Sequence, residues 1–464
     1  MRPSIPMLFG ALLLAGCAVG PKYKRPAADV PPQFRGAAAA GPQSLADVQW
    51  FDLFQDDVLK QLVRTSLEQN YDLRIAAERV LQARAQLGIA RAGQLPEIDA
   101  TALFGASRSS LIGSNRLVPA NSKLDVAYTQ AGFSLGWELD VWGRVRRLKE
   151  AARAQYLATE EARRGVLTTL VGDVASTYFE LRELDLELDI SHKTRDIAEQ
   201  GLHLTTVRKN RGAATGLDIK QAEQLLYTAT ALSAGTERSI AQTENYLSLL
   251  LGRGPAAIPR GKPLEAFAAP AQIPAGLPSS LLERRPDIRQ AEQNLIAANA
   301  RIGVAKAAYF PQISITGFLG GQSRALENLF TGPARLWTLT PVADLPIFDA
   351  GRIRSTVRLS QAAQREAVLT YQKSIQNAFR EVSDSLIGHQ KTTEQRRQQE
   401  LLVGALREST RLSMLRYRGG MDSYLQVLDS QRNLFSGELV LAQLRRDEMV
   451  SVVQLYRALG GGWK

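Results

Sequence analysis

Few side chains in this sequence are suited to catalysis or to metal binding. Among 464 residues there is one cysteine, Cys17, and there are three histidines, His192, His203 and His389, whose spacing fits no common zinc site. The sequence contains no recognisable nucleophile–base set and no phosphate-binding loop. We therefore expect a protein without enzymatic activity, without a metal centre and without a cofactor.

The single cysteine follows a segment with the properties of a secretory signal. Residues 1–16 contain an apolar run that is too short to span a bilayer as a helix. The run Leu14-Ala15-Gly16-Cys17 resembles a bacterial lipobox, at which the signal is removed and the cysteine is acylated. An unpaired thiol is a liability in an oxidising compartment, which favours lipidation of Cys17 over an incidental cysteine behind an ordinary signal peptide. Residues 17–43, rich in Pro, Ala and Gly, would then form a lipid-anchored extended tether.

Two glycine-containing turns bring charged and aromatic residues together along the chain. Residues 207–212 (VRKNRG) and 415–420 (LRYRGG) both combine cations with a glycine. Cations complement the dipole at the end of a helix, and glycine supplies the left-handed cap. Thr215 with Asp218, and Ser423 with Gln426, have the spacing of capping boxes that open a second helix. We expect both turns to be the tips of helical hairpins.

The placement of proline defines the elements that carry these turns. No proline lies between Pro119 and Pro255 or after Pro346, so two windows of more than a hundred residues are free to be helical. Apolar residues recur there at steps of four and three, as in helices packed side by side. These residues are Leu167, Val171, Val174, Tyr178 and Leu181 in the first window, and Ile375, Phe379, Val382 and Leu386 in the second. A helix over about 143–211 would be roughly 100 Å long, which exceeds the needs of one globular core.

Short stretches of alternating apolar and polar residues precede the long helical windows. They cover about 98–104, 131–137, 313–317 and 337–341. A period of two indicates strands with one apolar face, and about ten residues suffice for a tilted strand to cross a bilayer. The alternative is a pair of soluble hairpins that pack on the helices. Four membrane strands cannot stand alone, because an open edge in lipid leaves backbone groups unpaired, so membrane strands would require an oligomer with closed cyclic symmetry.

The chain also contains an internal repeat. Residues 70–105 align without gaps with residues 285–320, and 12 of the 36 positions are identical. Further along, 143–146 (GRVR) matches 351–354 (GRIR). The repeated unit is a helix, a strand pair, a long helix, a tight turn and a return helix.

These observations predict the organisation of the whole chain. A signal peptide (1–16) and the tether (17–43) precede a first structural repeat (44–254) with a strand pair at about 97–138. A connecting equatorial segment (255–278) leads to a second repeat (279–464) with a strand pair at about 312–346. Each repeat ends in a long helical hairpin.

Several longer motifs identify a family that the chain resembles. They are Gly20-Pro21-x-Tyr23, Trp50-Phe51-x-x-Phe54-x-Asp56, Asn70-Tyr71-Asp72-Leu73, residues 277–288 (LPSSLLERRPDI), residues 305–311 (AKAAYFP) and residues 456–463 (YRALGGGW). With the lipobox, they make the chain similar to TolC-like outer-membrane factors, in the lipoprotein branch often called NodT-type, which serves resistance-nodulation-division (RND) efflux pumps.

The resemblance implies a fold and a role. The fold would be a mixed membrane α-barrel plus β-barrel with long coiled-coil-like helices, four membrane strands per subunit and closure as a homotrimer. The role would be a passive exit duct for small molecules or ions in the outer membrane, coupled to a periplasmic adaptor and an RND-type inner-membrane pump. Alanine at position 18, after the cysteine, favours outer-membrane sorting in that family.

The resemblance also assigns roles at the hairpin tips. It places a periplasmic gate at Asp218 and Asp429, with Arg208, Arg416, Tyr417 and Arg418 holding the helix pairs together. It places adaptor contacts at Gly212, Thr215, Gly216, Gly419, Gly420 and Ser423. The chain departs from the family at Gln426, where an Asp is common, and at Asp422, where an Arg is found. The structural alternative is that Asp218 only caps a helix and that the arginines only complement helix ends.

Other classes of protein remain as alternatives. A secretion duct of the same fold and a periplasmic coiled-coil scaffold or adaptor both use long helices, but the scaffold would lack the duplicated strand pairs. The net charge of +11 and the pI of about 9.7 would permit nucleic-acid binding, yet also contact with anionic lipid or an acidic partner. Because the chain carries an export signal, we expect no nucleic-acid role. Trp137, Trp142 and Trp337 would either form an aromatic belt at the membrane surface or pack at the strand–helix junction.

Overall fold

The computed structural model describes residues 18–37, 44–48, 55–108, 110, 125–269 and 273–461. The expected signal peptide, Cys17, most of the loop between the first two strands, the motif segment at 50–54 and the last three residues lie outside the described residues. The chain divides into two compact units. We call residues 1–26, 81–158 and 291–370 the strand-bearing unit, and residues 27–80, 159–290 and 371–464 the helical unit.

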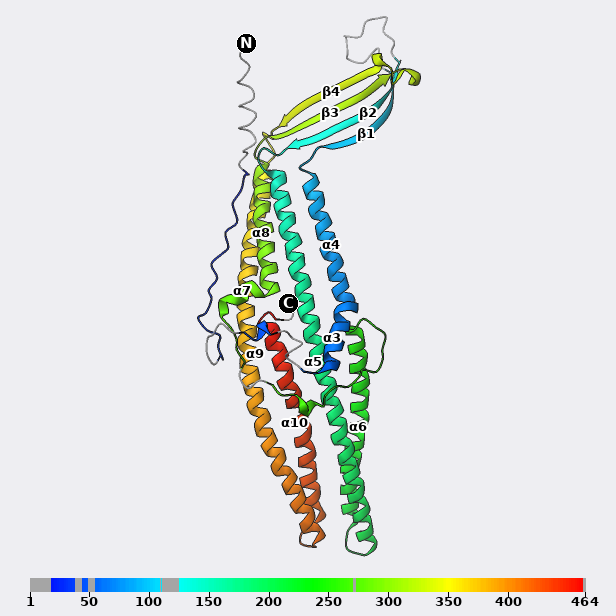
Figure 1. Cartoon of the computed structure of the whole chain (residues 1–464), viewed down its shortest axis with the longest axis vertical. Coiled ribbons are helices and arrows are strands. Elements are labelled where there is room, and N and C mark those ends of the chain that lie inside the picture. The colour runs from blue at the N-terminus through cyan, green and yellow to red at the C-terminus, as the bar shows by residue number, and fades with distance from the viewer. Residues whose placement is uncertain are drawn as a thin grey trace. The chain divides into compact units, whose positions relative to one another are not determined.

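The order of elements alternates helices and strand pairs (Figure 1). After the short α3 (Asp57–Gln69) and α4 (Tyr71–Ala92) come β1 (Glu97–Arg108), β2 (Asp125–Leu139), α5 (Arg144–Asn210) and α6 (Gly216–Leu250). The second half contains α7 (Leu281–Arg284), α8 (Pro286–Ala307), β3 (Gln312–Ser323), β4 (Arg335–Asp344), α9 (Arg352–Arg418) and α10 (Tyr424–Ala458).

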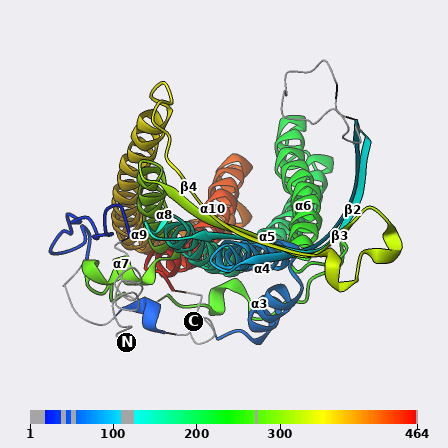
Figure 2. The same ribbon diagram turned by 90° about the horizontal axis from the view of Figure 1, so that it is seen from above.

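The four strands form one antiparallel sheet in the order β1-β2-β3-β4. Figure 1 shows them side by side in a curved sheet, which Figure 2 presents from above. Cross-strand partners share a face, and Phe133 lies opposite both Ala100 and Leu319, while Leu319 lies opposite Trp337. The predicted alternation is therefore confirmed. The apolar members of the four strands gather on one face, which includes Ile98, Ala100, Phe133, Leu135, Ile315, Leu319, Trp337 and Leu339.

The long helices follow the predicted windows. α5 spans Arg144–Asn210 where 143–211 was expected, and α5 and α9 are both 67 residues long. α6 and α10 are both 35 residues long. Val174, Tyr178 and Leu181 of the predicted heptad pattern are 0% exposed. Full burial of one such side chain stabilises the fold by about 1.5–3 kcal/mol, so the spacing of these residues holds α5 against its neighbours.

Both long helices begin in the same way. The Asp140 carboxylate accepts hydrogen bonds from the N–H groups of Val145 and Arg146, each at 2.8 Å, and thereby caps α5. The Asp349 carboxylate accepts from the N–H groups of Gly351 and Ile353 and caps α9. Such caps satisfy backbone donors that a helix start leaves free.

The beginning of the described chain packs closely on the strand-bearing unit. The N–H of Val19 donates to the carbonyl of Trp142 at 3.0 Å, and the amide of Asn299 donates to the carbonyl of Pro21 at 3.0 Å. The Arg25 guanidinium binds the Glu292 carboxylate of α8 with two contacts of 2.6 Å. The segment that follows Cys17 is thus extended but attached along α8.

Among the described residues, no helix combines the length and the apolar composition needed to cross a bilayer.

Candidate functional site

The first hairpin tip joins α5 to α6. Gly212 has φ +80°, a conformation that side chains other than glycine rarely adopt, and the N–H of Ala213 donates back to the carbonyl of Arg208 at 2.8 Å. The Thr215 hydroxyl accepts from the N–H of Asp218, and the Asp218 carboxylate accepts from the N–H of Thr215 at 2.7 Å. The predicted capping box is confirmed here. Asp218 is half-buried, and its carboxylate is engaged in the cap.

The second tip joins α9 to α10 and is built differently. Ser423 precedes α10, but its side chain makes no capping hydrogen bond, so the second predicted capping box is wrong. The N–H of Gln426 donates at 3.3 Å to the backbone carbonyl of Ser423, which leaves the hydroxyl without that role. Gly420, with φ +76°, makes the turn itself.

The second tip contains an ion pair between the end of α9 and the turn. The Arg416 guanidinium binds the Asp422 carboxylate through two contacts of 2.6 and 3.0 Å. The hydrogen bond from Arg416 lowers the pKa of Asp422 below its usual range. Asp422 is one of the two positions at which the sequence departs from the pattern that the resemblance implies. The ion pair with Asp422 therefore holds the Arg416 guanidinium within the second tip.

Several contacts link the two hairpins close to their tips, and one of them joins two of the predicted gate residues. The Arg208 guanidinium of α5 lies 4.1 Å from the centre of the Tyr417 ring of α9, and it donates to the Tyr417 carbonyl at 3.4 Å. Tyr417 is 4% exposed and packs against Tyr424, with ring centres 5.2 Å apart. A cation over an aromatic ring contributes about 0.5–2 kcal/mol, more when water is excluded. Arg208 and Tyr417 therefore form a latch between the hairpins, and we call them the latch pair.

Asp429 and Arg418 are two further predicted gate residues. Asp429 is exposed and accepts a hydrogen bond from the Asn433 amide at 3.2 Å. Arg418 is exposed. A groove of about 640 Å³ between α9 and α10 is lined by Glu408, Leu412, Arg416, Asp422 and Gln426, among other residues. The sequence did not indicate this groove, because its lining comes from two helices and follows no local pattern.

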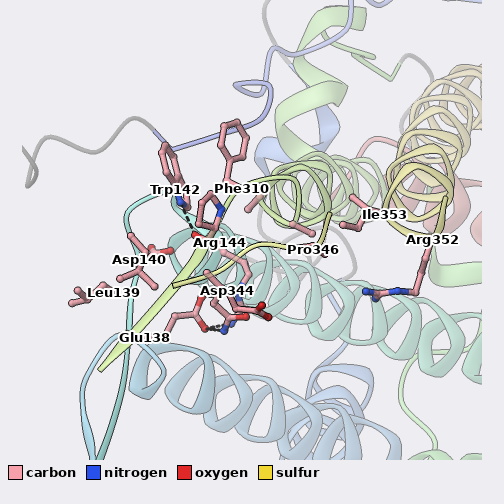
Figure 3. Close-up of a pocket in the computed structure, with 15 residues that line it drawn as sticks. Glu138, Leu139, Asp140, Trp142, Arg144, Phe310, Asp344, Pro346, Arg352 and Ile353 are labelled. Atoms are coloured by element: carbon pink, nitrogen blue, oxygen red, sulfur yellow. Dashed lines mark hydrogen bonds and ion pairs between the residues drawn. The ribbon is translucent and has the colours of Figure 1, made fainter. Parts of the chain in front are cut away.

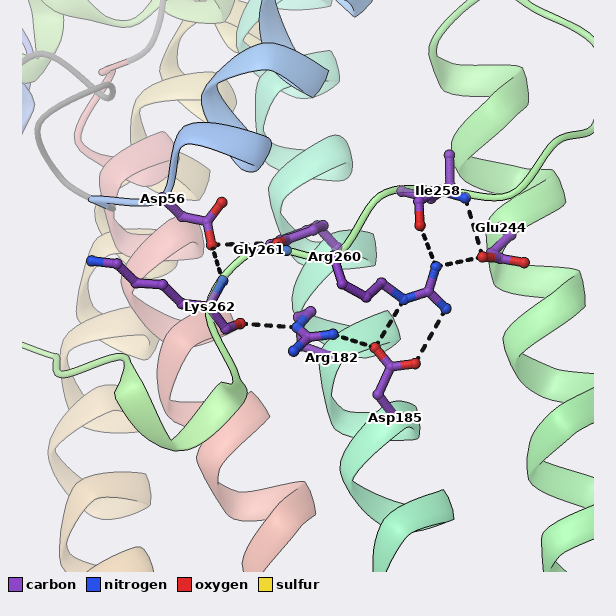
Figure 4. Close-up of polar contacts among 9 residues, drawn as sticks. Asp56, Arg182, Asp185, Glu244, Ile258, Arg260, Gly261 and Lys262 are labelled. Carbon is purple, nitrogen blue, oxygen red and sulfur yellow. Dashed lines mark hydrogen bonds and ion pairs between the residues drawn. The ribbon is translucent and has the colours of Figure 1, made fainter.

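A polar cluster attaches the connecting segment to the helical unit (Figure 4). The Arg260 guanidinium binds both oxygens of Asp185 on α5, at 3.0 and 3.2 Å, and also binds Glu244 on α6. The N–H of Lys262 donates at 2.7 Å to the Asp56 carboxylate. Asp56 is 1% exposed and also caps α3. Arg260 thus holds α5, α6 and the segment after α6 together. Sequence reasoning missed this role, although Asp56 belonged to a recognised motif.

A pocket of about 350 Å³ lies where the strands of the strand-bearing unit meet its helices (Figure 3). The Arg144 guanidinium forms a two-contact ion pair with Glu138 beside it. Trp142 stacks on Phe310 with ring centres 4.7 Å apart and donates from its indole N–H to the Pro311 carbonyl. Trp142 therefore packs at the junction, whereas Trp337, 73% exposed, lies on the apolar face of the sheet.

A buried glutamate lies between α5 and α10. The Glu183 side chain is 4% exposed, and its carboxylate is 3.4 Å from Arg446 of α10. Burial, together with the hydrogen bond and the charge of Glu187, raises the pKa of Glu183 to about 8. Within the described part of the chain, no three His, Cys, Asp or Glu side chains are placed to hold a metal ion.

Comparison with known proteins agrees with this geometry. The family model described as "Outer membrane efflux protein" matches residues 62–253 and 277–461. The solvent efflux pump outer membrane protein SrpC of Pseudomonas putida is 41% identical over 99% of this chain and 98% of its own length. The cation efflux system protein CusC of Escherichia coli is 35% identical over 98% of this chain and 97% of its own length.

Solved structures have the same fold. The open state of the Neisseria gonorrhoeae MtrE outer membrane channel superimposes with a TM-score of 0.86 and 31% identity, over 97% of this chain and 99% of that one. Such proteins are channels, which agrees with the lack of a catalytic residue set in the sequence. The chain belongs to the outer membrane efflux protein family, and it is a duct of an efflux pump rather than an enzyme.

Proposed function

We propose that this chain is the exit duct of a tripartite efflux pump, in which three copies form one channel joined to a periplasmic adaptor and an RND-type inner-membrane pump. The observation that carries the proposal is the four-stranded sheet with one continuous apolar face. In lipid such a sheet has to close, because backbone groups on an open edge would stay unpaired. Three copies supply twelve strands, with β1 of one copy beside β4 of the next.

The chain has the properties of an internal duplication, which we propose as its domain organisation. The equal lengths of α5 and α9, and of α6 and α10, support repeats at 44–254 and 279–464 joined by the segment 255–278. The capping aspartates Asp140 and Asp349 support the same conclusion.

The cargo inferred for the duct is broad. The two named relatives belong to a solvent pump and to a cation system. A duct common to both needs no tight binding site, so we infer passive conduction of small molecules or ions, with selection left to the pump. Cys17 is proposed as the lipidated N-terminus that anchors the duct in the outer membrane, behind a signal peptide at 1–16.

The hairpin tips are proposed as gate and docking site. Asp218, Asp429, the latch pair, Arg416 and Arg418 would close the periplasmic end. Glycine tolerates close approach of another backbone, so Gly212, Gly216, Gly419 and Gly420, with Thr215 and Ser423, would meet the adaptor. The exposure of these six residues supports the docking role.

The test is reconstitution of the full chain. Light scattering in detergent should give a trimer, and planar bilayers should show single channels with a low resting conductance. Replacing Gly212 and Gly420 with tryptophan should abolish efflux in cells while trimers persist in the outer membrane. A monomer that forms no channel would contradict the proposed duct. Loss of the trimer in the tryptophan variant would assign the glycines to folding instead.

A further inference from the structure

A groove of about 680 Å³ lies in the apolar face of the sheet and is formed by all four strands. Its floor is made of small residues, because Ala131 lies opposite Ala102 on one side and opposite Gly321 on the other. A wall of large side chains borders this floor. It is formed by the neighbouring row of cross-strand partners on the same face, Phe133, Leu319 and Trp337. This volume lies in the range of roughly 300–1,000 Å³ that is usual for small-ligand pockets.

The connection between β3 and β4 closes one end of the groove. A β-carbon added at Gly321 would overlap the carbonyl oxygen of Leu329, so the connection lies directly on the strand there. Leu329 is 3% exposed, while the next residue, Phe330, is 84% exposed and lines the groove. The groove is therefore bounded by the strands and by their connection, with the aromatic side chain of Phe330 at its rim.

Arg335 is the charged residue among the described residues that line the groove. It lies opposite Gly321, on the apolar face, and is exposed. The strand-bearing unit has 22 Lys and Arg residues against 11 Asp and Glu residues, whereas the helical unit has 35 of each. The positive excess of the whole sequence thus falls within the unit that contains the groove. Arg335 supplies the positive charge at the groove itself, so the groove complements an anion attached to an apolar chain.

We propose that this groove binds an acyl chain of an outer-membrane lipid whose headgroup phosphate pairs with Arg335. The guanidinium group offers a planar set of donors that matches a phosphate. The inference rests on the proposed function, in which the apolar face of the closed sheet contacts lipid. Cargo is not the ligand, because in that arrangement cargo passes along the opposite face, which carries Asp99, Ser134, Thr316 and Thr340.

The test measures lipid retained by the full-length protein. Wild type and variants are loaded in detergent with phosphatidylglycerol or phosphatidylcholine of equal acyl length, and retained lipid is counted by native mass spectrometry. Wild type should retain phosphatidylglycerol at least threefold better than phosphatidylcholine. Arg335→Gln should abolish this preference, whereas Ala131→Leu or Ala102→Leu should reduce retention of both lipids by filling the floor. Arg324→Gln, an exposed arginine of the same connection outside the groove lining, should behave as wild type.

Two results would overturn the lipid site. One is equal lipid retention by wild type, Arg335→Gln and Ala131→Leu. The other is binding of inorganic phosphate alone that depends on Arg335 and is unaffected by Ala131→Leu, which would identify a free anion as the ligand. Conductance of the same samples separates this inference from the proposed duct. Channels that conduct normally with unaltered lipid retention contradict only the groove, whereas a wild type that forms no channel contradicts the duct.

Discussion

At the scale of single residues, Asp218 has two possible roles that the structure makes separable. Its carboxylate accepts the Thr215 N–H at 2.7 Å in a capping box, which is a sufficient structural reason for an aspartate at this position. The gate hypothesis requires an additional role, in which three copies of Asp218 form an acidic ring. Because Thr215 belongs to the same cap and carries no charge, it provides a matched control.

We predict that Asp218→Ala and Thr215→Ala both lower the free energy of unfolding by about 1 kcal/mol, the usual cost of a lost cap. Chemical denaturation of the full chain measures this loss. Single-channel conductance then separates the roles, since only Asp218→Ala should raise resting conductance and weaken cation selectivity. Equal conductance of both variants would leave Asp218 as a capping residue alone.

The latch pair leads to a second prediction at this scale. Replacing Arg208 with Met removes the cation 4.1 Å from the Tyr417 ring and the hydrogen bond to its carbonyl. The hairpins should then separate more easily, and the resting conductance of the channel should rise. Arg211→Met, which removes an exposed cation from the same tip, should conduct like wild type. Tyr417→Leu should reproduce the effect of Arg208→Met, and a failure to do so would mean that the ring does not hold the arginine.

At the scale of elements, local patterns in the sequence were sufficient to predict the positions of the long helices and the strands. The absence of proline and the steps of four and three predicted α5 to within one residue at each end. The alternation of apolar and polar residues predicted the four strands. It also indicated their shared apolar face, because the register of a sheet places alternate residues on the same face. These signals are local, and in the helices the structure preserves them because burial of the apolar stripe stabilises the fold.

Contacts between distant segments could not be predicted in this way. Arg260 binds Asp185, which lies 75 positions earlier, and no periodicity connects the two. The attachment of residues 18–25 to α8 could not be predicted either. A Pro- and Gly-rich segment predicts an extended chain but not the element on which that chain packs. At the second tip, the spacing of Ser423 and Gln426 matched a capping box. In the structure, however, the N–H of Gln426 donates to the backbone carbonyl of Ser423 and not to its hydroxyl.

The contact of α5 with α10 predicts a pH dependence. The folded state raises the pKa of Glu183 to about 8, above the ordinary value of 4.5, mainly through burial. Between these pH values the folded chain holds a proton that the unfolded chain has released. The contribution of Glu183 to stability is therefore fully present below about pH 4.5 and is lost as the pH rises through 8. Glu183→Gln should flatten this slope and be more stable than wild type above pH 8.

Urea denaturation of the full chain at several pH values measures the slope. Glu199→Gln, which neutralises an exposed glutamate of the same helix, should retain the slope of wild type. If Glu183→Gln and wild type lose stability in parallel between pH 5 and 8, Glu183 is charged in the folded state and the paired Arg446 compensates its burial.

At the scale of the whole molecule, the two units differ in charge and in exposed surface. The strand-bearing unit contains the net charge of +11 and the sheet with its exposed apolar side chains, such as Leu319 at 65% and Trp337 at 73%. The helical unit has equal numbers of both charges and contains the buried heptad positions. Exposed apolar surface of this extent is costly in water, so the sheet requires lipid on one face.

This requirement leads to the last prediction, which tests which face of the sheet contacts the membrane in the proposed closed assembly. Leu319 lies on the apolar face of β3, and Thr316 lies on the opposite face of the same strand. Leu319→Lys should cost about 2–4 kcal/mol per copy in the bilayer, and the proposed trimer would bear that cost three times. Heat-resistant trimers in the outer membrane should therefore be strongly reduced for Leu319→Lys, whereas Thr316→Lys should assemble normally and lower cation conductance by placing three positive charges in the lumen. Normal assembly of Leu319→Lys together with loss of assembly for Thr316→Lys would reverse the orientation of the sheet, and with it both the proposed lumen and the lipid groove.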